Sequence, residues 1–143
     1  MIAFISRLEG SLLTMAESST LSPVRSRSVG DLAVIYAGNY LNKLSGERIE
    51  RECRRQLDAG CRALIINFHE TELVNSIGVS ILLGVIDAVE TTGARLVFSD
   101  VNHQTVQLFE MLGLTRHVAL AKDEQEALAT LSEFAPTLKA VGH

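Results

Sequence analysis

Ala63-Leu64-Ile65-Ile66-Asn67-Phe68 is the stretch that decides the fold, because it is a nearly continuous apolar run. A strand that is apolar on both sides is typical of the centre of a sheet that helices cover on both faces. A loop follows over 69–74, and the next helix is expected to begin near Ser76, run to about Thr91 and end at Gly93. This order of strand, loop and helix indicates an α/β domain.

The same alternation continues toward the N-terminus. The run 32–37 predicts a strand, and an edge strand is expected before it, near 24–29. Between 32–37 and the central run, Ser45 can cap a helix that ends at Gly60, where a positive φ is often needed. Its apolar stripe consists of Ile49, Cys53 and Leu57.

Toward the C-terminus, 95–99 predicts another strand, after which Asn102 caps a helix that closes at Gly113. A short strand over 118–121 follows, and the D-x-x-E pattern from Asp123 opens the last helix. The sequence therefore predicts a single α/β domain with a mixed, mostly parallel sheet of four to five strands and about four crossover helices.

The helix from Ser76 is expected to pack on the sheet through a broad apolar stripe, and the helix after Asn102 carries a shorter set of apolar residues. The helix from Ser76 carries Ile77, Ile81, Leu82, Val85, Ile86 and Val89. The helix after Asn102 carries Val106, Phe109 and Leu112. The two cysteines, Cys53 and Cys61, are too far apart for a C-x-x-C pair, so both are expected to be reduced and buried.

Length and charge narrow the class of protein. A chain of 143 residues suits one domain, here expected over 29–133, with a weakly ordered extension over 1–28 and a tail over 134–143. A net charge of −4 argues against general binding to nucleic acid or anionic membranes. Since no apolar run approaches the ~20 residues of a membrane span, a cytoplasmic protein without direct membrane insertion is expected.

Signatures of metal sites and enzymes are incomplete in this sequence. The four histidines lack i,i+4 pairing and have no cysteines at ligand spacing, so no metal and no cofactor are expected. Gly78-Val79-Ser80-Ile81-Leu82 is half of a G-x-S-x-G nucleophile motif, with Leu82 where glycine is required. Between Gly78 and Gly84 there is no Lys-Ser/Thr of a phosphate-binding loop. The protein is therefore expected not to be an enzyme.

Four motifs in their order along the chain resemble the STAS family of sulfate transporters and anti-sigma factor antagonists. Val74-Asn75-Ser76-Ile77-Gly78 stands after the central strand, where the family has an Asp-Ser-x-Gly turn that opens a helix. Further along come Gly93-Ala94-Arg95-Leu96-Val97-Phe98, the helix and turn 106–114, and the closing helix that starts at 123–128. The resemblance covers about residues 30 to 132.

The resemblance implies a regulator that acts by protein–protein contact. In such families the serine of the turn is phosphorylated by a partner kinase, and by position this serine is Ser76. The implied partner is an anti-sigma factor or a serine kinase of the histidine-kinase-like ATPase type, with a phosphatase as a further candidate. A weak homodimer is left open. The implied partner-binding residues are Asn75, Ser76, Ile77, Gly78, Val79 and Ser80.

The chain also departs from the family pattern. Asn75 replaces the usual aspartate, which removes a carboxylate that could orient the serine hydroxyl, although asparagine still suits a helix cap. Ser76 and Asn75 could also simply cap the helix, as such residues do in many proteins. The alternative function is therefore a non-phosphorylated STAS subunit that docks in a larger transport or signalling complex. Whether a small ligand binds is left open.

Overall fold

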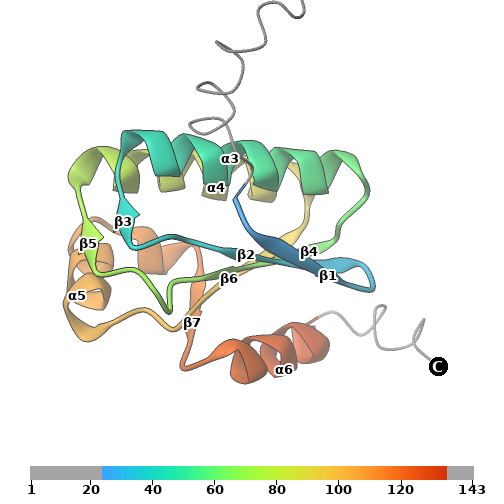
Figure 1. The fold of residues 1–143 in the computed structure, drawn as a ribbon. Coiled ribbons are helices and arrows are strands. Elements are labelled where there is room, and N and C mark those ends of the chain that lie inside the picture. Colours follow the sequence, from blue (N-terminus) through green and yellow to red (C-terminus); the bar gives the residue numbers. More distant parts are fainter. Residues whose placement is uncertain (1–23, 135–143) are drawn as a thin grey trace, which may run out of the picture.

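The computed structural model describes residues 24–134, which form a five-stranded sheet between layers of helices (Figure 1). In spatial order the strands are β1 (Ser26–Val29), β2 (Leu32–Tyr36), β4 (Ala63–Asn67), β6 (Arg95–Ser99) and β7 (Ala119–Ala121). β1 pairs antiparallel with β2, whereas the other neighbours pair parallel. The predicted α/β class with a mixed, mostly parallel sheet is confirmed.

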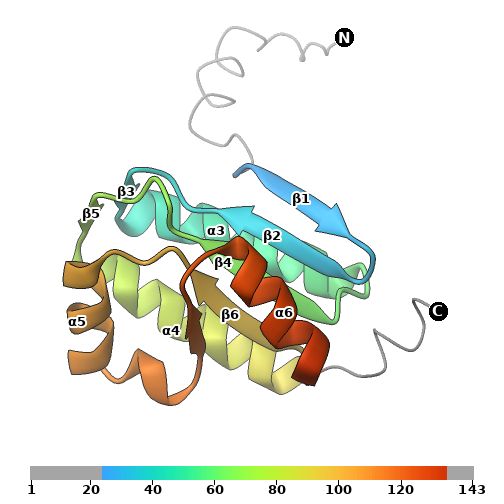
Figure 2. The same cartoon turned by 90° about the horizontal axis from the view of Figure 1, so that it is seen from below.

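Helices cover both faces of the sheet, as the apolar central strand predicts. Figure 1 shows α3 (Lys43–Asp58) and α4 (Ser76–Thr92) on one face and α6 (Glu124–Phe134) on the other. Figure 2, seen from below, places α6 across the strands and α5 (His103–Met111) at one end of the sheet. A short 3-10 helix, η1 (Leu114–Arg116), links α5 to the last strand.

Side chains that alternate along the strands divide the core into two clusters. In β2, Ala33 and Ile35 point toward α3 and α4, while Leu32 and Val34 point toward α6. Every residue of β4 is buried, because both of its faces are covered. The two clusters share the sheet, so one domain contains a core on each side of it.

Contacts among three phenylalanines hold α5 against the larger of the two clusters, which is the one on the α3 and α4 side of the sheet. Phe68, at the end of β4, packs edge-on against Phe98 of β6, with 5.1 Å between ring centroids. Phe109 of α5 lies 5.7 Å from Phe68 and 5.6 Å from Phe98. Tilted rings at these separations favour contact between a ring edge and a ring face.

The structure corrects the predicted start of α3 and the predicted loop over 69–74. Asn42, not Ser45, is the N-cap, because its side chain accepts a bond from the Ser45 N–H; the Ser45 hydroxyl accepts from the Asn42 N–H in return. The loop ends in a two-residue strand, β5 (Leu73–Val74), which pairs in parallel with a second unpredicted strand, β3 (Tyr40–Leu41).

The structure also corrects the expectation for two residues of the predicted apolar stripes. Ile77 and Leu112 are exposed, whereas the rest of both stripes is buried or partly buried. Ile77 lies in the first turn of α4, and Leu112 is the C-cap of α5. Both residues thus stand at a helix end, where the apolar stripe of the helix stops being buried.

Several other expectations concern single residues or the chain ends. Gly60 has the positive φ expected after its helix, and Gly93 and Gly113, which were expected to end theirs, also have positive φ. Cys53 is buried as expected, but Cys61 is only partly buried. The expected domain limits of 29 and 133 stay a prediction, and β1 extends the sheet to Ser26. Most of the predicted extension over 1–28 and all but the first residue of the predicted tail over 134–143 lie outside the described residues.

None of the helices described between residues 24 and 134 combines the length and the hydropathy that crossing a membrane requires.

Candidate functional site

The candidate site lies where the short ladder of β3 and β5 meets the start of α4, at the left of Figure 1. Tyr40 pairs with Leu73, and Leu41 pairs with Val74. The next residue, Asn75, continues the ladder, because its N–H donates to the Leu41 carbonyl over 2.9 Å. The ladder thereby fixes the direction in which α4 begins.

Asn75 is the N-cap of α4. Its backbone is extended, with φ −108° and ψ 165°, and its Oδ1 accepts a bond of 2.8 Å from the Gly78 N–H. One of the N–H groups that a helix start leaves without an intrahelical acceptor is thus satisfied. The capping role predicted for this position is therefore present, and it falls to Asn75 rather than Ser76.

Gly78 is required by the closeness of α4 to β3. A Cβ at this position would lie 2.7 Å from the Leu41 carbonyl oxygen and 2.8 Å from its carbonyl carbon. Both atoms belong to the backbone, so a side chain could be accepted only if a strand or the helix moved. The glycine of the turn motif lets α4 pack directly on the β3 backbone.

Ser76 is the first residue of α4, and its side chain is exposed. Ile77 is 53% exposed, and Ser80, one turn later, is also exposed. The Ser80 hydroxyl donates to the Ser76 carbonyl over 3.1 Å. Val79 is only 1% exposed and Gly78 is buried, so neither can offer a side chain to a partner in this conformation.

Sequence reasoning missed two exposed apolar side chains beside Ser76. Leu73 of β5 is 62% exposed, and its ladder partner Tyr40 is also exposed. Neither belongs to a run long enough to predict a strand, so the sequence offered no signal for the pair. We call Tyr40, Leu73, Ser76, Ile77 and Ser80 the Ser76 surface; all five members are uncharged.

Within residues 24–134, no group of three or more histidine, cysteine or acidic residues is placed to hold a metal ion. The thiols offer no reactive group either, because burial raises the pKa of Cys53 to about 12 and also raises the pKa of Cys61. A thiolate is the nucleophilic form, so neither cysteine is activated. The Ser76 surface itself offers exposed hydroxyl groups beside exposed apolar side chains.

Solved structures at low sequence identity share this fold. A variant of RsbS from Moorella thermoacetica matches with a TM-score of 0.71 at 21% identity, covering 80% of this chain and 99% of its own. The Bacillus cell fate determinant SpoIIAA in the phosphorylated form matches with a TM-score of 0.61 at 20% identity, covering 76% and 98%. An anti-sigma factor antagonist from Mycobacterium paratuberculosis gives 0.66 at 15% identity, covering 75% and 91%.

The sequence itself matches the STAS domain over residues 24–127. This match takes in every strand of the sheet, the ladder of β3 and β5, and the start of α4 with Ser76. It spans well over half of the chain. The protein therefore belongs to the STAS domain family.

Proposed function

We propose that this STAS domain is an anti-sigma factor antagonist-like signalling protein. Its Ser76 surface binds a partner kinase or anti-sigma factor, and phosphorylation of Ser76 switches that binding off. The observation that carries the proposal is the exposed Ser76 hydroxyl at the start of α4, on an uncharged surface with exposed Leu73 and Ile77. No chemistry by this chain's own residues is needed for such a role.

The position of Ser76 lets the fold tolerate a phosphate. A phosphate adds a charge of about −1.5 to −2, which the N-terminal end of a helix accommodates through its dipole and its free N–H groups. Since Ser76 is exposed, the added group extends into water and displaces no buried side chain. We therefore expect the modified domain to remain folded.

The same charge would act strongly on a bound partner. Because Ser76 directly precedes Ile77 and is exposed with it, we expect a partner that covers Leu73 and Ile77 to cover Ser76 as well, and an unpaired phosphate buried there would lose its hydration. A cost of about 2.7 kcal/mol already weakens binding about a hundredfold. Modification of one hydroxyl can thus turn binding off without a change of fold.

The comparisons support a switch of this kind. SpoIIAA is solved in both its phosphorylated and its unphosphorylated forms, and both match this chain. A structure from the stressosome, described as a signal integration and transduction hub, matches with a TM-score of 0.65 at 19% identity. We therefore expect the partner to be a protein of the same kind of signalling system, a kinase of the histidine-kinase-like ATPase type or an anti-sigma factor, with a phosphatase that reverses the modification.

A second function is favoured by Asn75. Its side chain caps α4 and leaves no carboxylate next to Ser76. A docking module that is never phosphorylated needs only the cap and the exposed apolar residues. In that function the Ser76 surface would bind a constant partner in a larger transport or signalling complex.

The first experiment is mass spectrometry of the protein from its native host, and of purified protein with candidate kinases and ATP. We expect phosphate on Ser76 and none in Ser76→Ala. Ser80→Ala is the matched control, because Ser80 is an exposed serine one turn further along the same helix. Phosphate that persists in Ser76→Ala, or no phosphate under any condition, would rule out the switch.

A binding measurement separates the two functions. If Ser76 is a switch, treatment of the wild type with the kinase and ATP should weaken binding to the partner at least tenfold, whereas the same treatment should leave the binding of Ser76→Ala unchanged. If the domain only docks, the treatment should change neither protein, while Ile77→Asp still abolishes partner binding. Circular dichroism of each variant checks that the fold is retained.

A further inference from the structure

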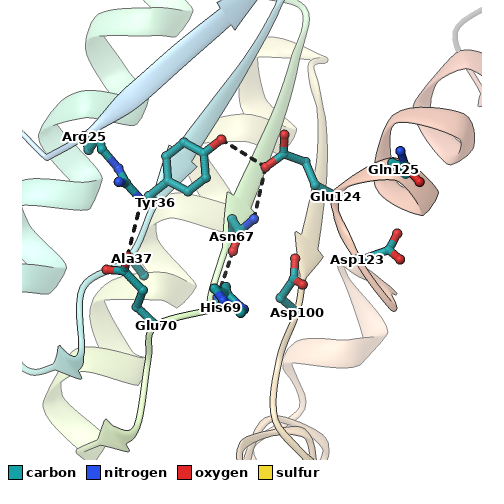
Figure 3. A pocket seen from close by; sticks show the side chains of 10 residues that line it. All are labelled: Arg25, Tyr36, Ala37, Asn67, His69, Glu70, Asp100, Asp123, Glu124 and Gln125. Carbon is teal, nitrogen blue, oxygen red and sulfur yellow. Dashed lines mark hydrogen bonds and ion pairs between the residues drawn. The ribbon is translucent and has the colours of Figure 1, made fainter.

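A pocket of about 290 Å³ lies on the α6 side of the sheet, away from the Ser76 surface (Figure 3). It opens at the carboxyl ends of β2, β4 and β6 and is closed on one side by the start of α6. Ligands of open α/β sheets commonly bind at this edge. The side chains that matter below are Arg25, Tyr36, Asn67, Glu70, Asp100 and Glu124.

Two of the carboxylates around the pocket already have partners. Glu70 forms an ion pair with Arg25 at 3.5 Å, and the Arg25 guanidinium lies 4.5 Å from the centre of the Tyr36 ring. Glu124 pairs with Arg27, and its Oε1 accepts bonds of 3.0 Å from the Tyr36 hydroxyl and 3.1 Å from the Asn67 amide. These charges are compensated within the protein.

Asp100 differs from these two carboxylates. Its Oδ2 is buried, and no hydrogen-bonding partner for this atom exists among residues 24–134. Figure 3 shows the Asp100 carboxylate pointing into the pocket, between Asn67 and the start of α6. Asp100 as a whole lines the pocket and is only partly buried, and none of the ion pairs among residues 24–134 includes it. A carboxylate whose charge is not compensated within the protein favours a cationic ligand beside it.

The backbone conformation of Asp100 is a second feature that sets this residue apart. Among the described residues, Asp100 alone combines a positive φ, 60°, with a residue other than glycine. Aspartate and asparagine adopt this left-handed conformation more readily than other residues with a side chain. Such backbone conformations cluster at functional sites, and here one stands at the pocket, directly after the last residue of β6.

We propose that this pocket binds a small organic cation with one ammonium or guanidinium group, and that the Asp100 carboxylate is its ion partner. The volume lies at the lower end of the range for small-molecule sites, roughly 300–1,000 Å³, so the ligand is small. A planar guanidinium can donate to two acceptors at once, which suits a carboxylate. The Tyr36 ring and Ala37 offer apolar contact to its carbon chain.

A metal ion fits this pocket less well. Calcium needs six to eight oxygen ligands, and magnesium requires nearly ideal octahedral geometry. No group of three or more carboxylate, histidine or cysteine side chains meets that need in the part of the chain that the structure describes. With Glu70 and Glu124 engaged by arginines, Asp100 and the helix-capping Asp123 are the acidic groups left at the pocket.

The test is an NMR titration of the full chain with butylguanidinium, and with butylurea as a neutral probe of the same shape. We expect saturable shifts of the amides of Asn67, His69 and Asp100 with butylguanidinium below about 10 mM, and none with butylurea. Asp100→Asn should weaken binding at least tenfold, and asparagine tolerates the positive φ that this position needs.

Asp87→Asn is the matched control, because Asp87 is an exposed carboxylate on α4, on the other face of the sheet. It should bind butylguanidinium as the wild type does. Equal binding of both probes, equal binding by Asp100→Asn, or no saturable shift would each overturn the proposal. A well-dispersed spectrum of Asp100→Asn shows that lost binding is not lost folding. The Ser76 switch does not enter any of these outcomes.

Discussion

Gly78, whose side chain is a single hydrogen atom, leaves room for the first turn of α4 to lie against β3. The Leu41 carbonyl occupies the place where a side chain would begin, so the residue after Ile77 can only be glycine while α4 and β3 keep their positions. Gly78 therefore allows α4 to pack closely on β3 directly beside the exposed Ser76.

Gly78→Ala tests this contact. Because the new Cβ would lie 2.7 Å from a backbone oxygen, we expect the free energy of unfolding to fall by about 1–3 kcal/mol, as measured by urea unfolding. Gly84→Ala is the control on the same helix, where the nearest atom, Glu50 Oε2, is 3.5 Å from the new Cβ. Alanine favours a helix over glycine by up to about 1 kcal/mol, so this variant should be as stable as the wild type or more stable. Equal stability of the two variants would contradict the close contact.

Individual residues of the site could be predicted only where a local rule applies. Asn75 follows the loop predicted over 69–74 and precedes an apolar stripe, which is where helix caps stand, and the structure confirms the cap. The burial of Val79 and the exposure of Ile77 depend instead on how the first turn of α4 packs against the rest of the fold, which no local rule gives. Asp100 carries no sequence signal at all, because its conformation and its unpartnered oxygen arise only when β6, β4 and α6 come together.

Among the strands, the five-residue ones could be predicted from the sequence and the two-residue ones could not. Each of the five-residue strands β2, β4 and β6 has an apolar run that identifies it, and the glycines with positive φ mark three helix ends. The two-residue strands β3 and β5 have no run, and they are stable only because they pair with each other. They are also the elements that present Tyr40 and Leu73, so the least predictable part of the fold supplies two of the three large apolar side chains of the Ser76 surface.

The docking of α5 gives a prediction at this scale. Phe109 is the side chain through which α5 reaches the rings of Phe68 and Phe98, so Phe109→Ala should lower the free energy of unfolding by about 3–5 kcal/mol. The control is Met111→Ala in the last turn of the same helix, where the side chain is 77% exposed. Its effect should stay within about 0.5 kcal/mol. Urea unfolding measures both, and similar losses would mean that Phe109 does not anchor the helix.

For the whole molecule, the two apolar clusters are joined through one sheet, so we expect a single cooperative unfolding transition. Buried titratable groups then act on the stability of the entire domain. Cys53 lies in the larger cluster, and burial raises the pKa of its thiol from 9.0 to about 12. Between these two pH values, the folded protein keeps a proton that the unfolded chain has released.

Unfolding above pH 9 therefore releases this proton, and the free energy of unfolding should fall as the pH rises, by up to about 1.4 kcal/mol per pH unit. In Cys53→Ala this contribution is absent, so the curve of stability against pH should be flatter than that of the wild type. Urea unfolding with a reducing agent, from about pH 8 to pH 10.5, measures the slope. Cys61→Ala should flatten it less, because Cys61 is only partly buried. If the slopes of wild type and Cys53→Ala agree, the core does not hold the thiol proton, and the larger cluster admits water or opens below the global transition.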